Sequence, residues 1–385
     1  MIKRNILDCM TLVGGTPSRY EGEKTYVSTG AVDCDHVDYA QAERVTYDNR
    51  PSRANLSVAE GDILFAKMCG TKKTLRIDRP LSEHLYSTGF CAVRANESIM
   101  DAALLYHLLA SDQFLTQKDQ NSSGATQKAI TSAGLRKIVI QVPDLSEQRK
   151  LAANLDCIEQ LMAKRREQLV SFDQLVKSRF IELFGDPVDN DRAWATKTLN
   201  SVCSTIVDCP HSTPSYTSDN TGYMCIRTSI VKKNHIMWDE IEYIPEQEYY
   251  QRIQRKRPER GDVIYTREGA ILGIAAMIDR ECNVALGQRS MLLSPNTYKC
   301  LPQFLSAAMN FDSFLRKVLG GVSGSASPHI NVGDIKAFAI ILPPIELQEQ
   351  FAAFVEQTDK SKLAVQKSLE ELEILKKSLM QQYFG

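Results

Sequence analysis

The chain has 385 residues, which is enough for two or three domains with hydrophobic cores of their own. Hydrophobic residues make up 43% and charged residues 24%, and no run of about 18 uncharged apolar residues predicts a membrane span. The net charge of −1 excludes a surface that is positive all over, but it allows local basic patches. The ten cysteines show no paired short spacings, so we expect reduced thiols and a cytoplasmic protein.

The first part of the chain alternates strand-like and helical patterns. A Gly-Asp pair at residues 61–62 comes directly before the apolar run "ILF", which predicts a turn followed by a buried strand. Apolar residues at helical spacing predict helix within 101–115. Further runs rich in Val, Ile, Phe and Tyr, bounded by Gly, Pro or Asp, predict strands at 24–32, 61–67, 89–95 and 136–142.

A long helix is predicted next. Pro143 ends the last strand, and Ser146 is a suitable N-cap with acidic Glu147 in the first turn. Beyond it, apolar residues recur at alternating spacings of four and three, which predicts a coiled-coil stripe. The stripe comprises Leu151, Leu155, Ile158, Met162, Leu169, Phe172, Val176 and Leu183, with Arg165 and Arg179 at its polar positions.

The second half of the chain repeats the first. Residues 124–185 align with 324–385 without gaps, thirteen of the 62 positions are identical, and the same offset aligns 60–67 with 260–267. Residues 15–58 and 208–258 share little, so a common framework carries two different surfaces. Strand patterns recur at 222–231, 261–268, 273–279, 289–295 and 336–343, with helical spacing at 301–319. The second stripe comprises Phe351, Val355, Val365, Leu369, Leu372, Leu379 and Tyr383, with polar Thr358, Lys362 and Lys376.

Each long helix has one apolar stripe and needs a partner. We expect the two helices to pair antiparallel, with one globular unit at either end of the rod and the polar stripe residues fixing the register. The alternative is two separate helices, each packed on its own unit. The predicted fold class is α+β, with two mixed α/β domains joined by an antiparallel coiled coil and related by a pseudo-twofold internal repeat.

No catalytic motif is recognisable. The sequence contains no dinucleotide fingerprint, P-loop, HExxH or GxSxG pattern, and an active site in both units would repeat its key residues. Cys203, Cys209, His211 and Cys225 do not have the spacing of a standard zinc site. We therefore expect no catalytic residue, no metal and no cofactor bound by this chain.

Basic clusters are the positive signal, one in each unit. Such clusters suit phosphate contacts, and Arg, Lys, Gln and Asn side chains nearby can read base edges. The candidate DNA contacts in the first unit are Thr29, Lys67, Lys72, Lys73, Arg76, Gln127 and Lys128. Those in the second unit are Arg227, Arg252, Arg255, Lys256, Arg257, Arg267, Gln288, Arg289 and His329.

The whole chain resembles the specificity subunit of type I restriction–modification systems. The resemblance is carried by the doubled layout and by the passage "GATQKAITSAGLRKIVIQVPDLSEQRKLA" with its copy "GSASPHINVGDIKAFAIILPPIELQEQFA". The "GDILF" and "GDVIY" strands and the helices that end in "LFG" and "YFG" complete it. It implies target-recognition domains at 1–144 and 186–344 and spacer helices at 145–185 and 345–385.

The resemblance also implies a function. Each domain would read one half of a split, asymmetric DNA site, and the helices would hold two methyltransferase subunits. Those subunits would methylate adenine with S-adenosylmethionine, and a separate motor–nuclease subunit would cleave unmodified DNA. Two alternatives stand beside this one: a coiled-coil adaptor that never touches DNA, and an enzyme with an unrecognised site, for instance zinc-dependent at Cys203, Cys209 and His211.

Overall fold

A computed structural model of the chain describes residues 2–320 and 328–384. The chain forms two compact units: the first unit comprises residues 1–167 and 366–385, and the second unit residues 168–365. The long helices α6 (Leu145–Phe184) and α12 (Ile345–Phe384) each contribute one half to each unit. No helix in the described ranges is long and apolar enough to cross a membrane.

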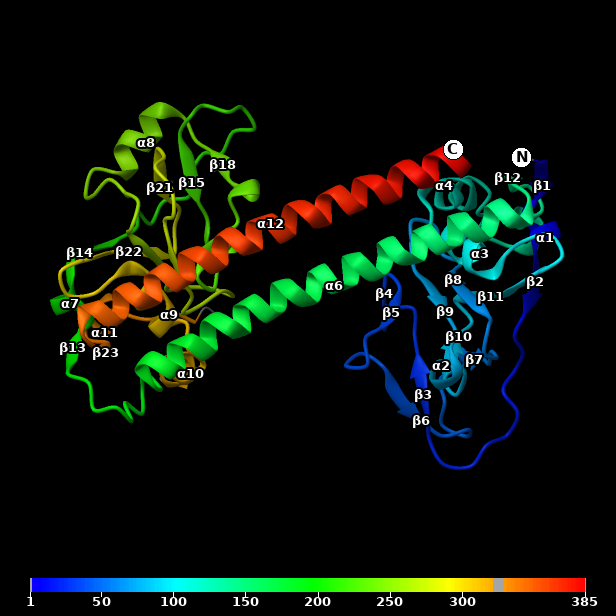
Figure 1. Cartoon of the computed structure of the whole chain (residues 1–385), viewed down its shortest axis with the longest axis horizontal. Helices are drawn as coiled ribbons and strands as arrows, with labels where there is room; N and C mark the ends of the chain where they lie inside the picture. Colours follow the sequence, from blue (N-terminus) through cyan, green and yellow to red (C-terminus); the bar gives the residue numbers. More distant parts are fainter. Residues whose placement is uncertain (1, 321–327, 385) are drawn as a thin grey trace. The chain divides into compact units, whose positions relative to one another are not determined.

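The first unit contains two four-stranded sheets and two two-stranded pairings (Figure 1). One sheet has the antiparallel order β2 (Met10–Val13), β11 (Phe90–Ala95), β8 (Ile63–Ala66), β9 (Thr74–Arg76). The other has the order β6 (Glu43–Val45), β3 (Lys24–Val27), β10 (Leu85–Ser87), β7 (Ala54–Leu56), in which β3 and β10 run parallel. β1 (Ile2–Asn5) pairs with β12 (Val139–Val142), and β4 (Val32–Asp33) with β5 (His36–Val37). The helices are α1 (Ile6–Cys9), α2 (Arg79–Ser82), α3 (Ala102–Leu109), α4 (Asp112–Gln120) and α5 (Ser132–Leu135).

The second unit repeats this plan. One sheet has the order β14 (Cys203–Asp208), β22 (Ser290–Pro295), β19 (Val263–Thr266), β20 (Ala275–Met277). The other has the order β18 (Glu242–Tyr243), β15 (Met224–Ile226), β21 (Val284–Leu286), again with a parallel pair, β15 and β21. β13 (Thr196–Thr198) pairs with β23 (Ala339–Ile341), and β16 (Val231–Lys232) with β17 (His235–Ile236). The helices are α7 (Leu199–Val202), α8 (Glu246–Arg252), α9 (Pro302–Met309), α10 (Asp312–Gly320), α11 (Val332–Lys336), and the 3-10 turns η1 (Thr228–Ile230) and η2 (Trp238–Glu240).

The two Gly-Asp pairs form the predicted turns before buried strands. Gly61 and Gly261 have φ angles of +86° and +92°, in the left-handed region that favours glycine. The Asp62 carboxylate accepts a hydrogen bond from the Ala59 N–H at 2.8 Å, and Asp262 does the same for Glu259 at 2.9 Å. The strands that follow, β8 and β19, are buried along their whole length because each lies inside its sheet.

Two buried glutamines show that the repeat extends to individual contacts. The Gln148 amide group donates to the carbonyls of Ile99 and Pro143, at 2.8 and 2.9 Å. Two hundred residues later, Gln348 donates to Lys299 and Pro343, at 3.1 and 2.9 Å. Both side chains are fully buried, so each hydrogen bond satisfies a carbonyl that water cannot reach. These contacts join the start of each long helix to its own unit.

The first long helix begins two residues earlier than an N-cap at Ser146 would place it. Ser146 lies inside α6, so its prediction as the N-cap is wrong. The Asp144 carboxylate caps the helix instead, accepting hydrogen bonds from the N–H groups of Ser146 and Glu147 at 2.9 and 3.0 Å. Both residue types favour this position, and only the backbone geometry decides between them.

The two long helices pack together antiparallel, as predicted, and the alternative of unpaired helices is wrong. In the first unit Lys376 of α12 binds Glu159 of α6 at 2.7 Å, while in the second unit Lys362 binds Asp173 at 2.6 Å. From one ion pair to the other the α12 residue number rises from 362 to 376, while the number of its α6 partner falls from 173 to 159. The two helices therefore run antiparallel. Every residue of the two predicted apolar stripes is buried or half-buried. The two ion pairs also show that polar stripe residues, Lys362 and Lys376, make contacts between the helices.

The helices meet the two units through different chemistry. In the second unit Phe180 and Phe184 of α6 pack against Phe304 and Phe351, with ring centroids 4.8–5.7 Å apart. In the first unit Leu151 and Leu155 are buried in the core, but charged residues stand beside them.

Candidate nucleic-acid interface

The first unit gathers four loop segments at one place, which we call the first interface. Lys67 N–H donates to the Gly89 carbonyl at 2.9 Å, and Ile130 N–H donates to the Lys67 carbonyl at 2.9 Å. Cys69 N–H donates to the Lys128 carbonyl, also at 2.9 Å. The first interface comprises residues 28–29, 67–73, 87–89 and 127–130.

The parallel pair of strands explains this convergence. Because β3 and β10 run in the same direction, the segments that follow them leave the same edge of the sheet. Loops at the carboxyl ends of parallel strands are common ligand sites for this reason. The Lys73 ammonium then donates to the Thr29 carbonyl at 2.8 Å and ties the loop after β8 to the loop after β3.

The second unit builds the same frame, which we call the second interface. Gly287 N–H donates to the Ile226 carbonyl at 2.9 Å, and Arg267 N–H donates to the Arg289 carbonyl at 3.0 Å. Ile330 N–H donates to the Arg267 carbonyl at 2.9 Å. The bonds of Arg267 and Ile330, together with one from Gly269 N–H to the Pro328 carbonyl at 3.1 Å, repeat those of the first unit two hundred residues on. The second interface comprises residues 227–228, 267–273, 287–289 and 328–330.

Most predicted DNA contacts of the first unit lie in the first interface. Gln127 and Lys128 are exposed, while Thr29, Lys67 and Lys73 are half-buried. Lys72 is exposed and pairs with Asp112 at 2.6 Å, an exposed ion pair that is weak and can open. These side chains offer ammonium and amide groups to phosphates and base edges.

Arg76 is also predicted to contact DNA, but it lies outside the first interface, with a side chain that is 41% exposed. Its guanidinium binds the Asp156 carboxylate at 2.5 Å and lies 4.1 Å from the centroid of the Tyr106 ring. These partners lie on α6 and α3, and they hold Arg76 at the junction between the domain and the helix. Its charge serves the fold of the first unit.

Four predicted residues of the second unit come together in the second interface. Arg289 and His329 are exposed, and Gln288 donates to the Thr213 hydroxyl at 3.2 Å. Arg227 pairs with Glu242 at 2.9 Å and lies over the Tyr216 ring. The segments that carry them are hydrogen-bonded to one another, so these side chains share one surface.

Two arginines of the second unit that are predicted to contact DNA have buried side chains. The Arg252 side chain is 3% exposed and binds Glu248 and the carbonyls of Ser212 and Leu286. The Arg267 side chain is 7% exposed and binds both oxygens of Asp208, at 2.9 and 3.2 Å. A buried guanidinium with all its partners in place holds loops together rather than reaching a phosphate.

The remaining basic residues form a separate run after α8. Arg255 and Arg257 are exposed and donate to the Asp208 carbonyl at 3.4 Å and to Asn283 Oδ1 at 3.0 Å. Lys256 is half-buried between Glu259 at 3.1 Å and Asp262 at 3.4 Å. Acidic neighbours therefore neutralise part of this run, and the two arginines are its accessible charges.

One cluster in the described ranges has the composition of a metal site. The nearest ligand atoms of His107, Asp156 and Glu159 lie within 4.8 Å of one another. Arg76 and Lys376 already bind the two carboxylates, at 2.5 and 2.7 Å, so cations of the chain itself occupy the ligand oxygens. Burial raises the pKa of Glu159, but His107 and Lys376 outweigh it and lower that pKa to about 2. We interpret this cluster, the ionic junction, as an ion network.

The candidate zinc ligands Cys203, Cys209, His211 and Cys225 do not assemble as a cluster of ligands in the described part of the chain. Burial raises the pKa of the Cys209 and Cys225 thiols, which keeps them protonated. His211 is exposed and pairs with Asp208 at 3.1 Å. These groups therefore show no activated nucleophile and no set of metal-binding thiolates.

Sequence reasoning missed one buried cation, Lys118 of α4, which is 1% exposed. A signal was present, because Lys118 lies one helical turn after Phe114 on the apolar face of the helix. A lysine at such a position marks a buried ion with specific partners. Its partners are the carbonyls of the loop that carries Lys67, Lys72 and Lys73.

Comparison with known proteins identifies the family. The type I restriction modification DNA specificity domain matches residues 19–170 and 192–374, well over half of the chain. The chain is 23% identical over 321 residues to the EcoKI specificity subunit of Escherichia coli (strain K12), covering 78% of this chain and 68% of that protein. It is 21% identical over 310 residues to the MjaVIII specificity subunit of Methanocaldococcus jannaschii, covering 77% and 72%.

Solved structures share the fold. A chain from a study of complex assembly and conformational transition in a type I restriction–modification system has a TM-score of 0.58 and 22% identity, covering 100% of this chain and 97% of that one. The S subunit of a type I system from M. genitalium has a TM-score of 0.56 and 14% identity, covering 100% and 96%. Together with the family match, these likenesses confirm the resemblance inferred from the doubled layout. The chain therefore belongs to the type I restriction–modification DNA specificity family, as the specificity subunit of an enzyme whose catalysis resides in other subunits.

Proposed function

We propose that this subunit reads a two-part, asymmetric DNA site, one half with each interface. The observation that supports the proposal is the pair of interfaces with equivalent backbones and different side chains. Gly89 corresponds to Arg289, and Lys128 corresponds to Pro328. Since base recognition depends on side chains presented from a fixed frame, two different sets predict two different half-sites.

The chemistry then falls to partner subunits. We infer two methyltransferase subunits that methylate adenine with S-adenosylmethionine, and motor–nuclease subunits that cleave unmodified DNA. The cofactor would bind in those methyltransferase subunits, since this chain is the recognition component. Work on chromosomal DNA would place the protein in the cytoplasm, and its ten cysteines are all free thiols.

The proposal is tested by mapping methyladenine across the genome of cells with and without this gene. We expect one split motif with two dissimilar halves to lose its methylation when the gene is removed. DNA binding by the assembled complex should also weaken steeply as salt rises, because phosphate contacts release counterions. An unchanged map with the partner methyltransferase expressed, or binding that is insensitive to salt, would support the adaptor hypothesis instead.

Arg289 offers a sharper test of the second interface. Its φ angle is +70°, in the left-handed region, so the arginine is held in a strained conformation that glycine adopts freely. We expect Arg289→Gly to keep the free energy of unfolding of the second unit or raise it by up to about 1 kcal/mol, as measured by urea unfolding. Discrimination at one half-site should fall by about 1–3 kcal/mol in competition binding with altered duplexes.

Ala193→Gly provides the matched control. Ala193 also has a positive φ, +53°, and is exposed, but it lies outside both interfaces. It should gain stability in the same way and leave DNA discrimination unchanged. Equal binding by the Arg289→Gly variant and the parent protein would remove Arg289 from the interface.

A further inference from the structure

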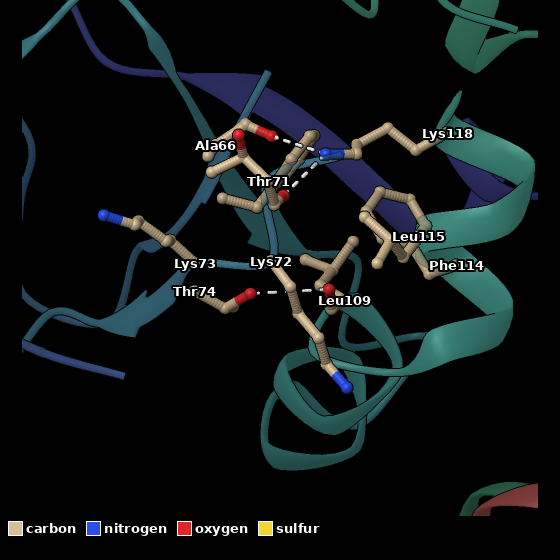
Figure 2. A pocket seen from close by; sticks show the side chains of 10 residues that line it. Ala66, Thr71, Lys72, Lys73, Thr74, Leu109, Phe114, Leu115 and Lys118 are labelled. Atoms are coloured by element: carbon tan, nitrogen blue, oxygen red, sulfur yellow. Dashed lines mark hydrogen bonds between the residues drawn. The ribbon is translucent and has the colours of Figure 1, made fainter. Parts of the chain in front are cut away.

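The ammonium group of Lys118 lies beneath the loop between β8 and β9. It donates hydrogen bonds to the carbonyls of Ala66 at 3.2 Å, Met68 at 2.8 Å and Thr71 at 2.8 Å. Figure 2 shows the side chain reaching from α4 toward Ala66 and Thr71, beside Phe114 and Leu115. All three N–H groups of the ammonium thus have a carbonyl partner, one at the end of β8 and two within the loop.

This arrangement makes the loop conformation depend on the lysine. Burying an ammonium is unfavourable unless its hydrogen bonds to water are replaced, and here burial lowers the pKa of Lys118. Conversely, the three carbonyls point toward the Lys118 ammonium, and without that ammonium they would lose a hydrogen-bond donor that they share. The neighbouring Asp119 adds a second tie, because its carboxylate accepts a hydrogen bond from Gly70 N–H at 2.9 Å.

The same loop supplies much of the first interface. It carries Lys67, Lys72 and Lys73, and its Cys69 N–H binds the Lys128 carbonyl at 2.9 Å. Lys73 in turn holds Thr29 at 2.8 Å. Since Lys67 N–H also donates to the Gly89 carbonyl, a change in the loop reaches all three other segments, although Lys118 itself is too buried to touch a ligand.

The second unit has no such lysine. Val318 occupies the equivalent position, and the corresponding loop is held by Arg267, which binds Asp208 and Glu268. Each unit thus supports its loop with a different buried cation, taken from a different place in the sequence. A substitution at 118 should act on the first interface alone.

We propose that Lys118 is a positioning residue that fixes the loop between β8 and β9 and so determines how sharply the first interface discriminates between DNA half-sites. The proposal rests on the proposed function of the two interfaces. It adds a specificity determinant that does not contact DNA.

The test is Lys118→Met in the full chain assembled with its methyltransferase subunits. Competition binding would use duplexes that carry single base-pair changes in one half of the methylated motif or in the other. We expect discrimination to fall about 10-fold in one half and to stay within about twofold in the other. Hydrogen exchange at the amides of residues 67–73 should speed up in the same variant, because the loop loses its support.

Lys317→Met, an exposed lysine on α10, controls for the change in charge and should have neither effect. Lys118→Arg, which keeps a cation and donors in place, should restore part of the discrimination. If Lys118→Met does not fold, Asp119→Ala removes the tie to Gly70 from a more exposed position and should weaken the same half-site by a smaller factor.

Several outcomes would overturn the inference. Full discrimination in Lys118→Met with accelerated exchange would show that the loop does not set specificity. An equal loss in both halves would show a general effect on the fold or on affinity. These results differ from failure of the proposed function, in which the parent complex itself would show no sequence discrimination.

Discussion

Replacing Phe351 with alanine is expected to lower the free energy of unfolding of the second unit by about 3–5 kcal/mol. The Phe351 ring is fully buried and packs edge-on against Phe180 and Phe184, with both centroid distances at 5.5 Å. The substitution removes this contact between α12 and α6 and leaves a cavity in the core. Such a loss is a large part of the 5–15 kcal/mol that stabilises a typical domain.

Tryptophan fluorescence during urea unfolding can measure this loss. Both tryptophans, Trp194 and Trp238, lie in the second unit, and the Trp194 indole donates to the Phe184 carbonyl at 2.9 Å. Leu363→Ala on the same helix is the control, because that side chain is 67% exposed and its loss should stay within about 0.5 kcal/mol. A loss below about 1 kcal/mol for Phe351→Ala would contradict close packing of the aromatic cluster.

The ionic junction of the first unit should make that unit sensitive to acid. The pKa of Glu159 lies at about 2 in the folded state against an ordinary value of 4.5, which corresponds to about 3 kcal/mol of stability. Because the folded pKa is the lower one, this stability is present at neutral pH and is lost as the pH falls from about 4.5 to 2. Asp156 acts in the same direction: burial raises its pKa, but Arg76 and His107 lower it below its ordinary value.

Glu159→Gln isolates this effect, because glutamine resembles the protonated acid. We expect the variant to be less stable than the parent by about 3 kcal/mol at pH 7, and the difference to vanish near pH 2. Far-UV circular dichroism would report the unfolding of both units, while tryptophan fluorescence would report the second unit alone. The unfolding midpoint seen by fluorescence should not move.

Glu356→Gln is the matched control for this experiment. It replaces an acid at the position equivalent to Asp156, where the carboxylate is 66% exposed and pairs with Lys360 at 2.9 Å. Solvent screens such a pair, so stability should change little at any pH. A pH-independent loss in Glu159→Gln would show that the junction acts through packing rather than charge.

Sequence patterns were most reliable where the physical signal is local and repeated. The apolar stripes of the long helices were correct at every position, because a helix exposes one face in a fixed period that burial must follow. The Gly-Asp turns were correct for a similar reason, since few residues adopt a positive φ without strain. The helical patterns at 101–115 and 301–319 instead form two helices each; in the first, the Ser111 hydroxyl accepts a hydrogen bond from Phe114 N–H and begins α4.

The roles predicted for charged residues were the least reliable part of the sequence-based prediction. Arg252 and Arg267 appear in basic runs typical of a DNA contact, yet both are buried against acids and carbonyls. Arg76 lies in the same kind of run and belongs to the ionic junction. Lys118, which the sequence did not mark as functional, supports the loop that carries the predicted DNA contacts Lys67, Lys72 and Lys73.

The sequence by itself determined the doubled framework, the antiparallel helix pair and the membership in a family of DNA specificity subunits. These follow from the periodicity of apolar residues and from a repeat at constant offset, and both can be read from the sequence without knowledge of any contact. Only the tertiary structure decided which cations are accessible and which are structural. The free energy of a charge depends on its burial and on partners such as Asp156 and Asp208, which lie far away in the chain and come close only when it folds.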